Sequence, residues 1–195
     1  YDEKLIDYEG IEYRTWNAYK SKLAGAILKG LKEMPIKEDQ KILYLGTSTG
    51  TTASHISDII GEKGVIYGVE FAARVMREFL ERCAKHRANI IPILADARDP
   101  RSYLDFVEEV DLIYIDVAQP EQAKILADNS DYFLKDKGKA LFAIKASSID
   151  VTLEPTEVFR REISLLEKRG FKIIQMLHLE PYDKDHAMVY LEKET

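Results

Sequence analysis

The sequence predicts an α/β fold with a mostly parallel, doubly wound sheet. Apolar segments of strand length alternate with segments of helical periodicity through most of the chain, which is typical of crossovers between parallel strands. The last two strand-like segments, 172–179 and 187–192, are separated only by a short polar loop. Because a parallel connection needs a long crossover, we expect one of these two strands to run antiparallel. No repeat or low-complexity tract interrupts the chain, which predicts one main domain.

The stretch 41–52, KILYLGTSTGTT, predicts a strand, a glycine turn and a helix. Its apolar run stops at Gly46 and is too short for a core helix, but it fits a buried strand. From Thr51 onwards, three isoleucines fall on one helical face. Open α/β sheets bind ligands at this edge, where backbone N–H groups of a helix N-terminus point towards the ligand. We therefore expect the ligand site at this turn.

Local patterns predict the other elements. The first sixteen residues alternate around Gly10, which indicates a short hairpin. Ser21 is a candidate N-cap for a helix that ends before Pro35. Pro92 indicates an edge strand, because proline cannot donate a ladder hydrogen bond. The expected strands are 41–45, 65–71, 90–94, 111–116, 139–145, 172–179 and 187–192, and the expected helices are 21–34, 51–60, 73–86, 100–109, 119–133 and 156–169.

The composition narrows the possible partners. Apolar residues make up 46% of the 195 residues, and charged residues 32%, which is typical of a globular domain. No apolar run reaches the length of a membrane span, so we expect no membrane partner. The net charge is −6, whereas domains that bind nucleic acid unaided usually carry a basic excess. An RNA substrate would therefore need a local basic patch or delivery by another component. The single cysteine, Cys83, favours a reducing compartment.

Acidic residues stand at the ends of three consecutive predicted strands: Glu70, Asp96 and Asp116. A carboxylate at Glu70 suits two ribose hydroxyls, which both NAD and S-adenosylmethionine carry. The turn has neither the G-x-G-x-x-G pattern of dinucleotide sites nor a P-loop. A carboxylate at Asp116 would attract a sulfonium and repel a phosphate, which favours S-adenosylmethionine. An NAD-dependent oxidoreductase and a non-catalytic assembly protein stay as alternatives.

A lysine near the same edge is the second informative feature. Lys145 ends an otherwise apolar strand, where it either extends to solvent or meets Asp116 over a reacting carbon. Lys22 lies near the start of the first helix, where a cation opposes the helix dipole unless a carboxylate compensates it. His186 and Asp185 stand where the last strand begins.

Seven segments carry a family resemblance: YRTWNAYKSKLAGAIL, LYLGTSTGTTASHISDIIG, YGVEF, NIIPILADARDP, DLIYIDVAQPEQAKILADN, AIKASSIDVT and LEPYDKDHAMV. They resemble fibrillarin, the methyltransferase of box C/D ribonucleoproteins, and DVAQP with LEPYDKDHA is the most specific part. The archaeal form is the closer fit, because the Gly/Arg-rich tail of eukaryotic members is absent. Archaeal members usually begin with a further small β-rich segment. We expect residues 1–16 to be a remnant of this segment and residues 17–195 to form the methyltransferase domain.

The resemblance implies a Rossmann-like class I methyltransferase fold and a guide-RNA-directed ribose 2′-O-methyltransferase. The methyl donor would be S-adenosyl-L-methionine and the acceptor rRNA, with tRNA as a further candidate. The implied partners are a box C/D guide RNA, its target RNA, a Nop-domain scaffold protein and a kink-turn-binding ribosomal-type protein. No metal is implied. The archaeal resemblance implies a cytoplasmic location, whereas a eukaryotic member would be nucleolar.

The resemblance also assigns site residues. The catalytic cluster would be Lys22, Asp116, Lys145 and His186, with His186 in place of the glutamate of related enzymes. The cofactor contacts would be Gly46, Thr51 and Thr52 near the methionine portion, Glu70 and Phe71 near the ribose, Asp96 and Ala97 near the adenine, and Asp116, Val117, Ala118 and Gln119 at the sulfonium end.

A ribose 2′-hydroxyl is a poor nucleophile until its proton is removed. A lysine can take that proton only if its pKa falls, and a second lysine nearby favours this by like-charge repulsion. We expect Lys145 to be the base, Lys22 to lower its pKa and to hold the ribose, and Asp116 to orient Lys145. The candidate RNA contacts are Arg14, Lys20, Arg98, Arg101, Lys85, His86 and Arg87.

Overall fold

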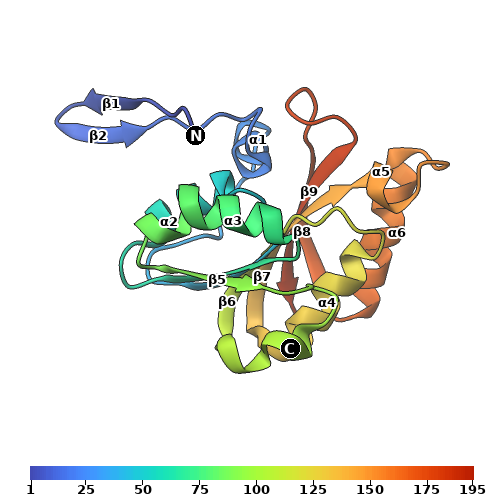
Figure 1. Ribbon diagram of the computed structural model, residues 1–195. Coiled ribbons are helices and arrows are strands. Elements are labelled where there is room, and N and C mark those ends of the chain that lie inside the picture. Colours follow the sequence, from blue (N-terminus) through green and yellow to red (C-terminus); the bar gives the residue numbers. More distant parts are fainter.

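The computed structural model describes residues 1–195 as a seven-stranded sheet covered by helices on both faces, with a separate two-stranded hairpin at the N-terminus (Figure 1). The hairpin consists of β1 (Leu5–Tyr8) and β2 (Ile11–Arg14). The sheet strands are β3 (Lys41–Leu45), β4 (Val65–Glu70), β5 (Ile90–Leu94), β6 (Val110–Ile115), β7 (Leu134–Lys145), β8 (Phe171–His178) and β9 (His186–Lys193). The helices are α1 (Lys22–Leu28), α2 (Thr51–Ile60), α3 (Ala73–Arg82), α4 (Gln122–Phe133), α5 (Ala146–Ile149) and α6 (Pro155–Lys168), with 3-10 turns η1 (Ala84–His86) and η2 (Pro100–Phe106).

The strand order is β5-β4-β3-β6-β7-β9-β8. Strands β3 to β7 pair in parallel, whereas β9 runs antiparallel to both β7 and β8. The predicted fold class is therefore confirmed, including the reversed strand near the C-terminus. Strand β5 lies at an edge of the sheet, so the prediction from Pro92 is also correct. None of the helices has the length and hydrophobicity needed to cross a bilayer.

The sheet separates two hydrophobic cores, and Figure 1 shows α2 and α3 on one side and α4 and α6 on the other. Along each strand the side chains alternate between the two cores. In β7, for example, Phe142 and Ile144 belong to the α4/α6 core, and Leu141 and Ala143 belong to the opposite core. We call the side that carries α1, α2 and α3 the α2 face.

The first helix is shorter than predicted, because α1 ends at Leu28 and not at 34. Gly30 then adopts a φ of +100°. The side chain of Gln175 on β8 donates to the Gly30 carbonyl at 3.0 Å and accepts from the Lys32 N–H at 3.0 Å. These contacts hold the segment after α1 against the edge strand and satisfy the Gly30 carbonyl and the Lys32 N–H outside the helix.

Other boundaries also differ from the prediction. Strand β7 begins at Leu134, five residues before the predicted start at 139, and its register with β6 shifts between Val110 and Leu112. The expected helix 73–86 divides at Cys83 (φ −134°) into α3 and η1. The expected helix 100–109 is the 3-10 turn η2, and the one-turn helix α5 was not predicted. Short elements of this kind carry little periodicity.

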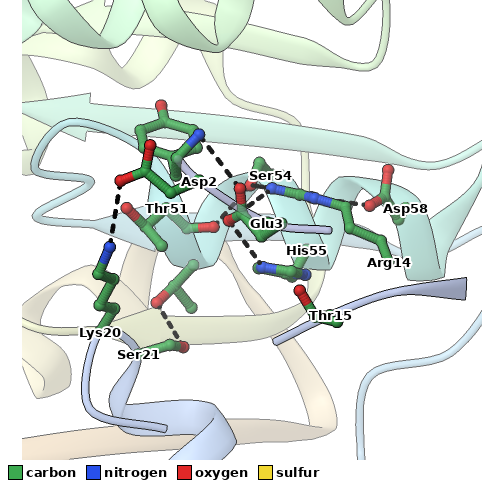
Figure 2. Close-up of polar contacts among 12 residues, drawn as sticks. Asp2, Glu3, Arg14, Thr15, Lys20, Ser21, Thr51, Ser54, His55 and Asp58 are labelled. Atoms are coloured by element: carbon green, nitrogen blue, oxygen red, sulfur yellow. Dashed lines mark hydrogen bonds and ion pairs between the residues drawn. The ribbon is translucent and has the colours of Figure 1, made fainter. Parts of the chain in front are cut away.

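A polar network joins the hairpin to α2 (Figure 2). Arg14, the last residue of β2, donates to Asp58 at 2.9 Å, to Ser54 at 2.8 Å and to Glu3 at 3.0 Å. The ring of Trp16 stacks on the buried His55, with the ring centroids 4.5 Å apart and an interplanar angle of 12°. The helix that begins at the glycine turn is therefore held to the N-terminal segment through Ser54, His55 and Asp58.

This junction predicts a loss of stability in mild acid. Burial, together with the nearby Arg14 guanidinium, lowers the pKa of His55 to about 4. An unfolded histidine titrates near 6.5, so between these pH values the unfolded chain binds more protons than the folded one. The free energy of unfolding should therefore fall as the pH drops from about 6.5 to about 4, by on the order of 3 kcal/mol in total.

Urea unfolding at pH 7 and pH 5 measures this dependence. His55→Gln should reduce the difference between the two pH values, whereas His178→Gln, which changes an exposed histidine at the end of β8, should leave it intact. An unchanged pH dependence in His55→Gln would mean that other groups cause the acid sensitivity.

Candidate active site

The glycine turn brings the ends of β3 and β6 into close contact. Gly46 follows β3 with a φ of +82°, and a Cβ atom placed on it would lie 2.3 Å from the backbone oxygen of Asp116. The Asp116 N–H in turn donates to the Leu45 carbonyl at 2.9 Å. Only glycine allows both the left-handed backbone and this approach. The turn therefore positions Asp116 beside the N-terminus of α2.

A cleft of about 320 Å³ lies at the carboxyl ends of these strands. Most of the predicted cofactor contacts line it: Gly46, Glu70, Phe71, Ala97, Asp116, Val117, Ala118 and Gln119. Ser48, Val69, Val75 and Ala95 also line the cleft and were missed, although each lies within a few residues of a predicted contact. The predicted residues from four separate strand ends thus meet in one cavity.

The three remaining predicted cofactor contacts do not line this cleft. Thr51 and Thr52 line a second cavity of about 230 Å³, which shares Gly46, Ser48 and Asp116 with the first. Asp96 lines neither of these two cavities, and its carboxylate pairs with Arg98 at 2.7 Å. The neighbouring Ala97 faces the cleft in its place.

Glu70 is held in a fixed orientation at the cleft. Its carboxylate accepts hydrogen bonds from the Ser48 N–H at 2.9 Å and the Ala72 N–H at 3.2 Å. Next to it, the phenyl ring of Phe71 is exposed although it lines a cavity. A rigid carboxylate beside an open aromatic ring can hold vicinal hydroxyls and a flat heterocycle at the same time.

Lys22, the first residue of α1, binds two carboxylates. Its Nζ lies 2.8 Å from Asp116 Oδ2 and 3.8 Å from Asp183 Oδ2. Burial alone would lower the pKa of Lys22, but Asp116 and Asp183 outweigh it, so the pKa is raised. A cation at this helix start is therefore compensated, as expected. The orientation of Asp116 differs from the expectation, because its carboxylate bonds to Lys22 and no hydrogen bond joins it to Lys145.

Asp116 and Lys145 lie on the same face of the sheet. In β6 Tyr114 faces the α2 side, and in β7 Ala143 does so, which by alternation assigns Asp116 and Lys145 to that side. Ile115 pairs with Phe142, so Lys145 lies further along the strand direction than Asp116. Gln122 holds this strand end, because its buried side chain accepts from the Lys145 N–H at 3.1 Å. The role of Gln122 was not predicted.

His186, the first residue of β9, is the register partner of Lys145. Met188 and Tyr190 face the α2 side, so His186 does too by alternation. Directly opposed residues of an antiparallel pair have their Cβ atoms about 5 Å apart. The structure therefore gathers the four predicted catalytic residues on one face and at one edge of the sheet.

Most of the predicted RNA contacts already have carboxylate partners. Arg14 pairs with Glu3 and Asp58, Lys20 with Asp2, Arg98 with Asp96, Lys85 with Glu81 and Arg87 with Asp58. Arg101 instead donates to the hydroxyl of Tyr132 at 3.0 Å. The predicted RNA contacts are thus largely neutralised by neighbours within the chain.

Comparison with known proteins identifies the family. The chain is 64% identical over 190 residues to the fibrillarin-like rRNA/tRNA 2'-O-methyltransferase of Staphylothermus marinus, which covers 97% of this chain and 81% of that protein. The crystal structure of Aeropyrum pernix fibrillarin with natively bound S-adenosyl-L-methionine superposes with a TM-score of 0.90 at 59% identity, covering 98% of this chain and 83% of that one. A fibrillarin/Nop5p complex matches with a TM-score of 0.88 at 43% identity, covering 96% of this chain and 87% of that one. The fibrillarin family model matches residues 1–195, and the chain belongs to the fibrillarin family.

Proposed function

We propose that this chain transfers the methyl group of S-adenosylmethionine to ribose 2′-hydroxyls of rRNA, and of tRNA as a further substrate, as the catalytic subunit of a box C/D ribonucleoprotein. The observation that carries the proposal is the junction of two cavities at Asp116. The names of the S. marinus and A. pernix relatives support both the reaction and the cofactor.

The two cavities fit the two halves of one elongated ligand. The larger has the Glu70 carboxylate, Phe71 and Ala97 on its walls, which suits an adenosine. The smaller is almost wholly polar and includes Thr51 and Thr52, which suits an amino-acid end. Their shared residue Asp116 would then lie beside the sulfonium, where its negative charge is complementary. When bound, S-adenosylmethionine supplies an electrophilic methyl group at this point.

In this proposal, the chain's own residues activate and hold the acceptor. Lys145 takes the proton of the 2′-hydroxyl while the oxygen attacks the methyl carbon and the sulfur keeps the bonding electron pair. Lys22 stays charged on Asp116 and Asp183 and orients the ribose. In-line displacement needs oxygen, carbon and sulfur close to one line, so positioning supplies much of the rate.

The partners follow from the charge of the chain. With a net charge of −6 and paired surface cations, the isolated chain is expected to bind RNA weakly. A Nop-domain scaffold, a kink-turn-binding protein and a guide RNA would deliver the target. The solved fibrillarin/Nop5p complex of a relative supports the scaffold.

Two measurements test the proposal. In calorimetric titrations the chain should bind S-adenosylmethionine and leave NAD unbound at the same concentration, whereas the reverse preference would favour an oxidoreductase. In a methyl-transfer assay, guide-paired RNA should be methylated by the chain together with the scaffold and the kink-turn protein, and poorly by the chain alone. Strong methylation by the chain alone, independent of a guide, would contradict the role of the partners.

A further inference from the structure

The loop between β8 and β9 places an additional carboxylate among the catalytic residues. Asp183 Oδ1 lies 2.9 Å from His186 Nδ1, and Asp183 Oδ2 lies 3.8 Å from Lys22 Nζ. The side chain of His186 is buried, and those of Lys22 and Asp183 are half-buried. One carboxylate therefore connects two members of the cluster that come from opposite ends of the chain.

The same contacts decide which ring nitrogen of His186 carries a proton. His186 Nδ1 faces the Lys184 carbonyl oxygen at 2.6 Å as well as the Asp183 carboxylate. Both groups only accept hydrogen bonds, so Nδ1 must be the protonated nitrogen of the neutral ring. Nε2 then presents a lone pair, and no hydrogen bond within the chain occupies it.

The His186 ring, which carries this Nε2 lone pair, lies opposite Lys145 in the β7–β9 ladder and on the same face of the sheet. An amine N–H of Lys145 donated to Nε2 would turn the lone pair of the amine away from His186 and towards a bound ribose. In this arrangement a carboxylate orients a histidine and the histidine orients the reacting group, as in a Ser-His-Asp triad.

We propose that Asp183 is a positioning residue of the methyl-transfer site, which fixes the ring of His186 against Lys145 and holds Lys22 on Asp116. The proposal rests on the proposed function. It assigns a role to a residue that lines the smaller, polar cavity but not the larger cleft, and that contacts Lys22 and His186 and not the expected reacting atoms.

The loop does not depend on this side chain for its shape. Leu179 is buried, and its carbonyl accepts hydrogen bonds from the N–H groups of Tyr182 and Asp183 at 2.9 and 3.2 Å. Tyr182 packs against Gly25 of α1 and contacts Tyr19 edge-on, with centroids 5.1 Å apart. Asp183→Asn should therefore keep the loop in place while removing the charge.

Asp185 offers a matched control in the same loop. Its φ of +56° is readily adopted by asparagine, and its carboxylate makes no ion pair with Lys22 or His186. Asp185→Asn removes the same charge two residues away. Any effect of net charge alone on RNA docking will thus appear in both variants.

Single-turnover methylation in the assembled complex tests the proposal. At saturating S-adenosylmethionine, Asp183→Asn should lower the rate at least about tenfold, and Asp183→Glu should recover part of the rate. Asp185→Asn should match wild type. Equal rates in Asp183→Asn and wild type, or equal losses in both asparagine variants, would overturn the proposal.

The nitrogen resonances of the His186 ring, measured by NMR at a single pH, give a readout that needs no turnover. Asp183→Asn removes the charged acceptor that lies 2.9 Å from Nδ1, so the Nδ1 resonance should shift in this variant and not in Asp185→Asn. An unshifted Nδ1 resonance would refute the contact. If wild type binds the cofactor but methylates no RNA, the proposed function fails, and the ring resonances still decide the role of Asp183 towards His186.

Discussion

Replacing Lys145 with alanine is expected to abolish methyl transfer and to leave the binding of S-adenosylmethionine intact. A positioned general base contributes about 10²- to 10⁴-fold to a rate, and Lys145 has this role in the proposed mechanism. Lys145 lines neither of the two cavities that meet at Asp116, so the cofactor should lose no contact. Calorimetry and single-turnover methylation measure the two effects separately.

Lys139→Ala is the control for this prediction. Lys139 lies on the same strand as Lys145 but in its middle, where it pairs with Glu192. Its loss should leave the methylation rate unchanged. Normal turnover by Lys145→Ala would remove Lys145 from the mechanism, and a loss of cofactor binding would place it at the cofactor instead.

Replacing Gly46 with alanine is expected to weaken cofactor binding and to slow methyl transfer at least about 100-fold. The new Cβ atom would lie 2.3 Å from the Asp116 carbonyl oxygen, so the end of β6 or the turn must move. Misplacement of reacting groups by about 1 Å can cost a factor of about 100 in rate. The left-handed backbone adds a penalty of roughly 1–2 kcal/mol for any residue with a side chain. Calorimetric titration and single-turnover methylation measure the effect of the clash, and thermal unfolding measures the loss of stability.

Gly61→Ala separates the clash from the backbone strain. Gly61 has a φ of +72°, similar to that of Gly46, but a Cβ atom there would meet nothing within 4 Å. This variant should lose stability by the backbone penalty and bind the cofactor as wild type does. Similar affinities of the two alanine variants would show that the close approach to Asp116 is unimportant.

The position of the site could be predicted because it depends on local sequence and one topological rule. The apolar run before Gly46 marks a strand, and the carboxyl ends of parallel strands meet at one edge. Glu70, Ala97 and Asp116 therefore fall in one cleft, although they are far apart in sequence. Asp96 follows its strand at the same edge, and the strand pattern does not predict that its carboxylate pairs with Arg98.

Contacts between distant segments could not be predicted in the same way. The end of α1 depends on Gln175, which lies 145 residues beyond the glycine that it binds. The ion pair of Asp116 with Lys22 depends on where α1 crosses the edge of the sheet, and sequence periodicity does not specify that position. Asp183 needs the shape of a loop before its distance to Lys22 or His186 has any meaning. Sequence patterns predict on which face of the sheet and at which strand end a residue lies. These three contacts depend, in addition, on the tertiary arrangement of the chain.

The antiparallel direction of β9 determines which insertions and register shifts the position of His186 tolerates. In a wholly parallel sheet, only residues that follow a strand lie at the edge that holds the active site. An insertion in one of these loops shifts their positions. His186 instead arrives as an opening residue of its strand, and the ladder to β7 fixes its Cα beside Lys145. Insertions early in the preceding loop would leave the backbone of His186 anchored in the ladder, whereas a one-residue slip of β9 would turn its side chain to the opposite side of the sheet.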